Sequence, residues 1–154
     1  MHVIEIFTGF HFPVDIVPVQ QTEYKTIDTE RYFFNWAEEQ TYEVYKLVLL
    51  EFSEPLGLIS FERISTEWRI HIRLLTVSKE NVGKSKKYDE VAGNLIAFVA
   101  KLAVLEYGEL ACVSLKPKTA IAKHYVHKYK MNITGTTVSL EVPEILDLIK
   151  NYEK

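Results

Sequence analysis

Three lysines, Lys84, Lys86 and Lys87, lie close together just after Gly83. A long apolar run begins at Leu95, shortly after them, and predicts a helix. The first amides of a helix have no internal acceptors and the helix dipole is positive there, so a glycine-containing loop before a helix favours an anion. The lysines add positive charge to such a cradle. The sequence therefore predicts a phosphate-binding loop, with a plain solvated lysine cluster as the alternative.

Two histidine patterns suggest other chemistry. His124 and His127 have a spacing that a metal pair can use on a helix, but no third ligand converges with them, and we expect no metal site. His71 lies in an alternating, strand-like segment and titrates near neutral pH, so it is a candidate base, with a surface residue or a satisfied core residue as the alternative. Neither pattern is specific enough to define a reaction.

Composition narrows the class of protein. The 154 residues are 47% hydrophobic and 25% charged, which predicts one globular domain with a proper core. The net charge of -3 argues against general nucleic-acid binding. Because we find no signal peptide and no long uninterrupted apolar segment, we expect a cytoplasmic protein that does not bind membranes. Cys112 is the single cysteine, which agrees with a reducing compartment.

Short strands dominate the first half of the predicted fold. The strand signals, read from alternation and turn residues, cover residues 3–7, 43–52, 56–63 and 68–77. The proline-interrupted residues 13–18 are predicted as a loop or irregular edge. Asp28 or Thr29 is expected to cap a short helix through Ala37, with an aromatic stripe in the core formed by Tyr32, Phe33 and Trp36.

The second half is predicted to contain the longest helix. A polar loop over residues 79–94 leads into a buried helix over residues 95–105, which ends at Tyr107-Gly108. The elements expected after it are a strand over 110–115 with Cys112 in the core, a helix over 119–129, a hairpin over 133–142 turning at Thr134-Gly135, and a helix from Pro143.

The loop resembles that of the GNAT superfamily of acetyl-coenzyme A-dependent N-acetyltransferases. The superfamily loop reads Gln/Arg-x-x-Gly-x-Gly/Ala before a helix, and residues 87–95 fit it with Lys87 for arginine and Glu90 for glycine. A bacterial branch with a longer loop reads Asn-x-Gly-Lys-x-Lys-x-Tyr-x-Gly-Val-x-Gly-Asn-Leu. The matching positions are Asn81, Gly83, Lys84, Lys86, Tyr88, Val91, Gly93, Asn94 and Leu95. Residues 113–119 and His124-Tyr125 resemble the same branch.

This resemblance implies an α+β fold over residues 1–154. Its central sheet would be mostly antiparallel, with about six to seven strands flanked by helices and splayed between the fourth and fifth strands. Acetyl-coenzyme A would be the co-substrate, with its pantetheine and acetyl carbonyl on Leu75, Thr76 and Val77. The residues implied for its phosphates are Gly83, Lys84, Lys86, Lys87, Val91, Ala92, Gly93 and Asn94.

The resemblance also implies direct transfer of the acetyl group to an amine. The family's usual proton donor to the departing thiolate is a tyrosine, and Tyr125 holds that place, with Tyr129 as a nearby competitor. A phenol suits the task because its ordinary pKa of about 10 lies near that of a thiol. The acceptor is expected to be a small-molecule or peptide amine, and a homodimer is common in this fold.

Two departures from the pattern leave a second hypothesis open. Glu90 puts a carboxylate where the superfamily prefers glycine, and Thr76 stands where the related branch carries a glutamate. The general base is therefore unassigned, with His71, Arg73 and Glu80 as the polar candidates. The alternative is a catalytically weak or inactive acyl-coenzyme A-binding or protein-interaction module. A nucleic-acid-binding domain that uses the lysine loop is the third hypothesis.

Overall fold

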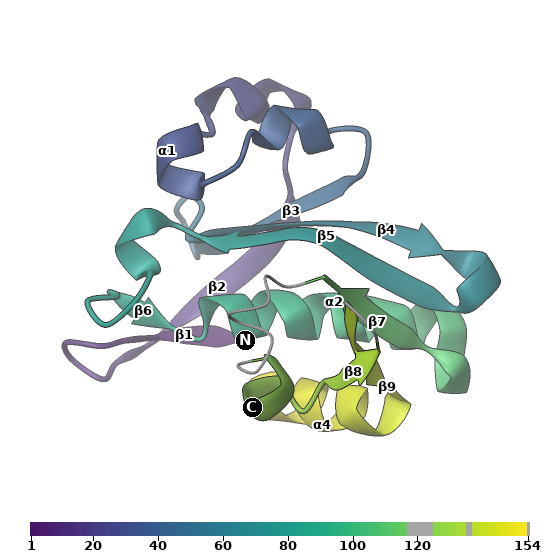
Figure 1. Ribbon diagram of the computed structural model, residues 1–154. Coiled ribbons are helices and arrows are strands. Elements are labelled where there is room, and N and C mark those ends of the chain that lie inside the picture. Colours follow the sequence, from purple (N-terminus) through teal and green to yellow (C-terminus); the bar gives the residue numbers. More distant parts are fainter. Residues whose placement is uncertain (117–124, 135–136, 154) are drawn as a thin grey trace. The chain divides into compact units, whose positions relative to one another are not determined.

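A computed structural model describes residues 1–116, 125–134 and 137–153 of the chain (Figure 1). These residues form two compact units, one made of Met1–Ser60 and Leu74–Leu95, the other of Phe61–Arg73 and Ile96–Lys154. We refer to them as the first and second units. Two strands and one helix cross from one unit to the other, namely β4 (Gly57–Ile64), β5 (Arg69–Val77) and α2 (Val91–Tyr107).

Four strands lie wholly in the first unit: β1 (His2–Glu5), β2 (His11–Pro18), β3 (Glu43–Leu49) and β6 (Tyr88–Asp89). β2 pairs antiparallel with β1 and with β3, and the short β6 pairs antiparallel with β1. The predicted strands over residues 3–7, 43–52, 56–63 and 68–77 are all present. The predicted polar loop is wrong in one respect, since it contains β6.

The prediction of an irregular segment at residues 13–18 is also wrong. β2 pairs with β1 through residues 11–13 and with β3 through residues 14–18, so Pro13 stands where the partner changes. The carbonyl of Pro13 accepts from the amide of Leu50 at 3.3 Å, a bond that needs no proline N–H. Pro18 ends the strand. The two prolines therefore occupy positions that a strand tolerates.

Short helices in the first unit pack against β3 and β4, where Tyr32 and Trp36 form a buried cluster with Val44 and Leu58 (Figure 1). They are η1 (Gln21–Thr26), α1 (Thr29–Tyr32) and η2 (Trp36–Glu39). The predicted cap is confirmed, because the Asp28 side chain accepts from the Glu30 amide at 2.9 Å. A continuous helix through Ala37 is wrong, because Phe33 has a φ of 70° and ends α1. Tyr32 and Trp36 are buried, whereas Phe33 is exposed.

The second unit contains β7 (Cys112–Leu115), β8 (Asn132–Thr134), β9 (Thr137–Glu141) and α4 (Val142–Tyr152). β8 and β9 form the predicted antiparallel hairpin, and α4 has the predicted proline in its first turn. Of the predicted helix over 119–129, residues 125–129 are helical and the rest lie outside the described residues, as does Gly135. Cys112 is only partly buried, which corrects its expected place in the core.

The long helix α2 begins at Val91, earlier than the predicted Leu95. Most of its apolar residues are buried as expected, but Leu105, in its last turn, is 75% exposed. Gly108, with a φ of 61°, follows its last residue. The helical stretch Val91–Leu110 is long and apolar enough to span a membrane by length and composition, but half of the tested window is buried, and core helices pass the same test. The early start makes Val91 to Asn94 the first helical turn.

The described strands form one sheet with the order β6-β1-β2-β3-β4-β5-β7-β9-β8. The α+β class with a mostly antiparallel sheet is confirmed, and the pairing of β5 with β7 is parallel. The sheet has nine strands, two more than the predicted elements supply, because β2 and β6 join it. A single domain over residues 1–154 stays a prediction.

Candidate functional site

The end of β5 supplies the first part of the candidate site. In the described residues its parallel pairing with β7 runs from Arg69 to Ile72, and β5 then continues to Val77. Thr76 is buried, and its Oγ1 donates to the carbonyl of Val77 at 3.0 Å. β5 thus extends past the described pairing, as expected of a strand that splays from its neighbour. Leu75, Thr76 and Val77 lie in this extension.

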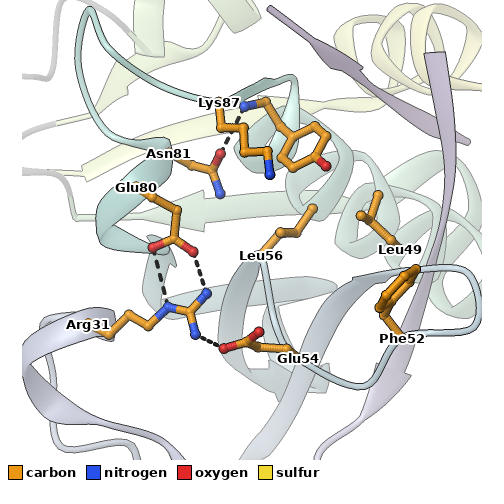
Figure 2. Close-up of a pocket in the computed structure, with 9 residues that line it drawn as sticks. Arg31, Leu49, Phe52, Glu54, Leu56, Glu80, Asn81 and Lys87 are labelled. Atoms are coloured by element: carbon orange, nitrogen blue, oxygen red, sulfur yellow. Dashed lines mark hydrogen bonds and ion pairs between the residues drawn. The ribbon is translucent and has the colours of Figure 1, made fainter. Parts of the chain in front are cut away.

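The loop after β5 is closed at its base by Asn81. Asn81 is only 4% exposed, and its Nδ2 donates to Oγ of Ser78 at 2.8 Å. Its Oδ1 accepts from the amide of Tyr88 at 2.9 Å (Figure 2). A second bond runs from the amide of Lys87 to the carbonyl of Glu80, at 3.1 Å. Residues 82–86 therefore project from a fixed base, and Gly83 within them has a φ of 77°, which explains a glycine there.

Replacing Asn81 by alanine is expected to destabilise the protein by about 1 to 2 kcal/mol, because it leaves buried hydrogen-bonding groups at both ends of the loop without their partner. Chemical denaturation followed by fluorescence measures this change. Asn35→Ala is the control, since its amide makes only a long, exposed contact of 3.5 Å with Glu38. Equal stability of the two variants would show that Asn81 does not close the loop.

The three lysines differ in their surroundings. Nζ of Lys86 forms an ion pair with Oδ1 of Asp89 at 2.8 Å. Nζ of Lys87 lies 5.5 Å from the ring centroid of Tyr88, and the carbonyl of Lys87 accepts from the amide of Ile6 at 2.9 Å. Lys84 is exposed. All three belong to the short loop between the base closed by Asn81 and β6, so the first unit brings them together as predicted.

The first turn of α2 follows directly. The first backbone bond of this turn runs from the amide of Asn94 to the carbonyl of Glu90, at 3.1 Å, so the amides of Val91, Ala92 and Gly93 precede it. Asn94 is fully buried, and its Nδ2 donates to the carbonyls of Glu90 at 2.7 Å and His2 at 2.8 Å. Its Oδ1 is buried and has no partner within the described chain. These bonds tie the helix start to β1.

Gly57, at the start of β4, allows the close approach of β5 and α2. A Cβ at this position would lie 2.7 Å from Cγ1 of Val91 and 2.9 Å from the carbonyl oxygen of Thr76. Both distances are below ordinary van der Waals contact. The absence of a side chain at Gly57 therefore sets the spacing between the end of β5 and the first turn of α2.

Glu90 keeps the backbone of a glycine. Its φ is 74°, in the left-handed region, and its amide donates to Oδ1 of Asp89 at 2.9 Å. A residue with a Cβ is strained in this region, whereas glycine adopts it freely. Glu90 therefore departs from the superfamily pattern in its side chain only. Its backbone has the conformation that a glycine would adopt at this position.

Replacing Glu90 by glycine is expected to raise the free energy of unfolding by about 1 kcal/mol, because glycine removes the strain at positive φ. Chemical denaturation measures the change. Glu90→Gln is the control, since it removes the charge but keeps the Cβ, and it should not stabilise the protein. A glycine variant less stable than the glutamine variant would contradict this account.

A cavity of about 190 Å³ adjoins the base of the loop. Figure 2 shows the guanidinium of Arg31 between the carboxylates of Glu54 and Glu80, and the Arg31 Nε to Glu80 Oε2 distance is 3.3 Å. The hydrogen bond from Arg31 lowers the pKa of Glu80. The same bond raises the pKa of Arg31. Glu80, a candidate base from the sequence, is therefore a partner of Arg31 that joins the loop to α1.

Tyr125 belongs to the second unit, in the helical residues 125–129. It is partly buried, and burial raises the pKa of its phenol. The ring of Tyr129, which is buried, lies 5.9 Å away at an angle of 37°. A raised pKa keeps the phenol protonated at neutral pH, which is the state a proton donor needs.

His71 is also in the second unit. Its Nδ1 lies 2.8 Å from Oγ of Ser114, which accepts from Nη1 of Arg69 at 2.7 Å. Burial and the nearby Arg69 lower the pKa of His71, so its imidazole is neutral near pH 7. Among the described residues no group of three His, Cys, Asp or Glu side chains could hold a metal ion, and His124 lies outside them.

Sequence reasoning missed Arg31, Glu54 and the role of Asn81. The longer loop pattern did contain a signal for Asn81, because it includes both Asn81 and Tyr88. These are the two residues joined by the hydrogen bond that closes the loop. Arg31 and Glu54 carried no such signal, since they are 23 residues apart and meet only in the folded chain.

Comparison with known proteins gives the fold. No protein-family model matches the sequence, and no curated protein matches it significantly. Solved structures do share its fold, at low identity. A GNAT family acetyltransferase from Elizabethkingia anophelis with acetyl-CoA bound has a TM-score of 0.61 and 12% identity, covering 84% of this chain and 98% of its own. A mutant of the spermidine N-acetyltransferase SpeG from Vibrio cholerae has a TM-score of 0.62 and 10% identity, with coverages of 86% and 96%.

A third structure with this fold is AtaT complexed with acetyl-methionyl-tRNAfMet. Its TM-score is 0.60 at 10% identity, and the match covers 88% of this chain and 99% of its own. The chain thus has the fold of the GNAT acetyltransferases, as the loop pattern predicted.

Proposed function

We propose that the protein is an N-acetyltransferase that binds acetyl-coenzyme A and transfers its acetyl group to an amine. The observation that carries the proposal is the arrangement in the first unit: a strand end, a closed lysine loop, the short strand β6 and the first turn of a long helix follow one another along the chain. This arrangement suits a ligand with an extended arm and a pyrophosphate. The GNAT fold supports the same ligand.

In this proposal each part of the site contacts one part of the co-substrate. The backbone of Leu75, Thr76 and Val77 pairs with the amide groups of the pantetheine arm, as one strand pairs with another. The amides of residues 91–93 and the lysine loop take the pyrophosphate. The fit is favourable because α2 begins at Val91 with Gly93 in its first turn, and because Gly57 leaves room for the close packing beneath it.

The reaction is a direct attack in a ternary complex. The nitrogen of a neutral amine forms a bond to the thioester carbonyl carbon, and the carbon–sulfur bond then breaks. The amine loses one proton, and the departing thiolate takes one. The protein contributes by holding both reactants in place and by supplying that proton.

Tyr125 is the proposed proton donor. Burial raises the pKa of its phenol, so that it carries its proton at neutral pH. No base is assigned to the proton that the amine loses. His71, which is neutral near pH 7, is the described candidate with the suitable protonation state.

The acceptor is proposed to be a primary amine of a small molecule or a peptide. The structures with this fold include a spermidine N-acetyltransferase and a protein in complex with acetyl-methionyl-tRNAfMet, so the fold accommodates acceptors of very different size. We propose that the protein acts in the cytoplasm, where it has access to acetyl-coenzyme A.

Isothermal titration of the purified protein with acetyl-coenzyme A tests the ligand. We expect one molecule bound per chain, and a ligand concentration 100 times the dissociation constant should add about 2.7 kcal/mol to the stability of the folded state. Lys87→Glu should weaken binding by about tenfold, because it removes a charge-assisted contact. Lys150→Glu, at an exposed position of α4, makes the same charge change and should leave the affinity unaltered.

One observation favours a second candidate function. Glu90 places a carboxylate beside the helix turn proposed to hold the pyrophosphate, and like charges there oppose binding. A catalytically weak or inactive acyl-coenzyme A-binding module would bind the ligand without turnover. Binding with no acetylation of any amine in a broad panel would favour it, and absence of binding would overturn both candidates.

A further inference from the structure

Two neighbouring strands of the second unit carry polar side chains on a shared face. β5 and β7 pair in parallel, with His71 opposite Ser114 and Ile72 opposite Leu115. Because side chains alternate along a strand, every second residue lies on the same face. One face is apolar and buried, and consists of Ile70, Ile72, Val113 and Leu115. The other, which we call the polar face, consists of Arg69, His71, Arg73, Cys112, Ser114 and Lys116.

Ser114 lies at the centre of the polar face and is only 2% exposed. Its Oγ is 2.7 Å from Nη1 of Arg69, which also binds Glu67, and 2.8 Å from Nδ1 of His71. A guanidinium can only donate, so Oγ accepts from Arg69. A buried hydroxyl proton needs an acceptor, and among the described residues that acceptor is Nδ1 of His71. Ser114 therefore donates to His71.

The bond from Ser114 fixes the tautomer of His71. The imidazole is neutral near pH 7, because burial lowers its pKa. A neutral imidazole that accepts a hydrogen bond at Nδ1 carries its proton on Nε2. Within the described residues Nε2 has no hydrogen-bond partner. His71 therefore offers a hydrogen bond from Nε2 to a ligand, whereas a general base would need a lone pair at that atom.

The charges around His71 are mainly positive. Besides burial, Arg69, Lys116 and Arg73 lower the pKa of His71, whereas Glu62 raises it. Arg73 and Lys116 are exposed, and they follow the last described pair of the two strands. Lys116 forms no ion pair with any residue that the structure describes. The exposed end of the polar face is therefore cationic.

We infer that the exposed end of the polar face binds an anionic group, a carboxylate or a phosphate, which accepts from Nε2 of His71 and pairs with Nζ of Lys116. Arg73 adds positive charge beside it. The inference rests on the proposed function in making this group part of the acceptor, since β5 continues from Arg73 into residues 75–77, which are proposed to bind the thioester arm. The acceptor is then an amine that also carries an anionic group. A polycationic amine is disfavoured, because like charges repel it.

Matched pairs of amines test the acceptor class. α-Amino acids are compared with their amides, and phosphoethanolamine with ethanolamine, so that one set presents a carboxylate and the other a phosphate. In the best pair, the anionic member should have a kcat/KM about tenfold higher, because it gains a charge-assisted contact. The same ratio is measured in each variant, so that differences in amine basicity cancel.

Lys116→Gln should lower this ratio about tenfold, through a higher KM for the anionic amine, and leave the neutral amine unaffected. Lys150→Gln is the matched control, since it makes the same charge change at an exposed position of α4. His71→Ala should also lower the ratio, and His71→Gln should retain more of it, because the glutamine amide can donate. Melting temperatures establish that every variant is folded.

Inorganic phosphate provides a test that needs no acetyl transfer. Nitrogen NMR of the imidazole in the wild-type protein should show the proton of His71 on Nε2. Added phosphate should raise the pKa of His71, because a negative charge nearby favours the imidazolium form. The rise should be smaller in Lys116→Gln than in Lys150→Gln.

The outcomes separate the two proposals. If anionic amines are preferred and Lys116→Gln reduces the preference while Lys150→Gln does not, the inference holds. If amines are acetylated with ratios that no variant changes, the inference is overturned and the proposed function stands. If no amine is acetylated, the proposed function fails, and an unchanged His71 pKa in phosphate would then overturn the anion site as well.

Discussion

Tyr125→Phe is expected to lower kcat for acetyl transfer about 100-fold, at the lower end of what a positioned general acid contributes. The substitution removes one hydroxyl and keeps the ring, so packing against Tyr129 is conserved. Release of free thiol from acetyl-coenzyme A in the presence of a panel of primary amines measures the rate. KM for acetyl-coenzyme A should change little, since the phenol acts on the departing sulfur.

The dependence of kcat on pH distinguishes a proton donor from a residue that only packs. The active form of Tyr125 is the protonated phenol, and its pKa is raised by burial, so its contribution is present at neutral pH and is lost only as the pH rises through the raised pKa. The Tyr125→Phe enzyme should lack this alkaline limb. Tyr129→Phe is the control and should retain the wild-type rate within about twofold. The reverse pattern, a slow Tyr129→Phe and an unaffected Tyr125→Phe, would assign the proton to the other tyrosine.

Gly57→Ala is expected to destabilise the protein by about 2 kcal/mol, a typical effect of overpacking. The added methyl would lie 2.7 Å from Cγ1 of Val91 and 2.9 Å from the carbonyl oxygen of Thr76. Neither atom is the free end of a flexible side chain, so β5 or α2 must shift. Because Thr76 and Val91 both belong to the proposed coenzyme A site, the affinity for coenzyme A should fall as well.

A double-mutant cycle isolates this clash. Val91→Ala removes the Cγ1 atom, so in that background Gly57→Ala should cost less stability than in the wild-type protein. Chemical denaturation of the four proteins gives the coupling energy. Equal costs in the two backgrounds would mean that the close approach at Gly57 does not constrain α2.

Most strands and the long helix were predictable because each has a local signal. Alternation marked β3, β4 and β5, and continuous apolarity marked α2. β2 was not predictable, since its two prolines argue against a strand and only the change of partner at Pro13 makes them acceptable. β6 is too short to have a pattern of its own, and it exists because β1 is there to pair with it.

The same distinction holds for the candidate site. The lysine loop and the helix start could be read from neighbouring residues. The bonds that fix them could not, because they join residues distant in sequence, as when Asn94 donates to His2 or Arg31 contacts Glu80. The conformation of Glu90 was beyond sequence reasoning for another reason: its residue type argues against the positive φ that it adopts.

The bond between Asn94 and the carbonyl of His2 spans 92 residues of chain. Closing so long a loop costs entropy before the contact is gained, and such contacts form late in folding. The first turn of α2 therefore takes its final place only after β1 has been brought to it. A ligand bound to the first turn of α2 therefore also stabilises the contact between Asn94 and β1. Ligand binding should slow the local opening of β1 as well as the opening of the lysine loop.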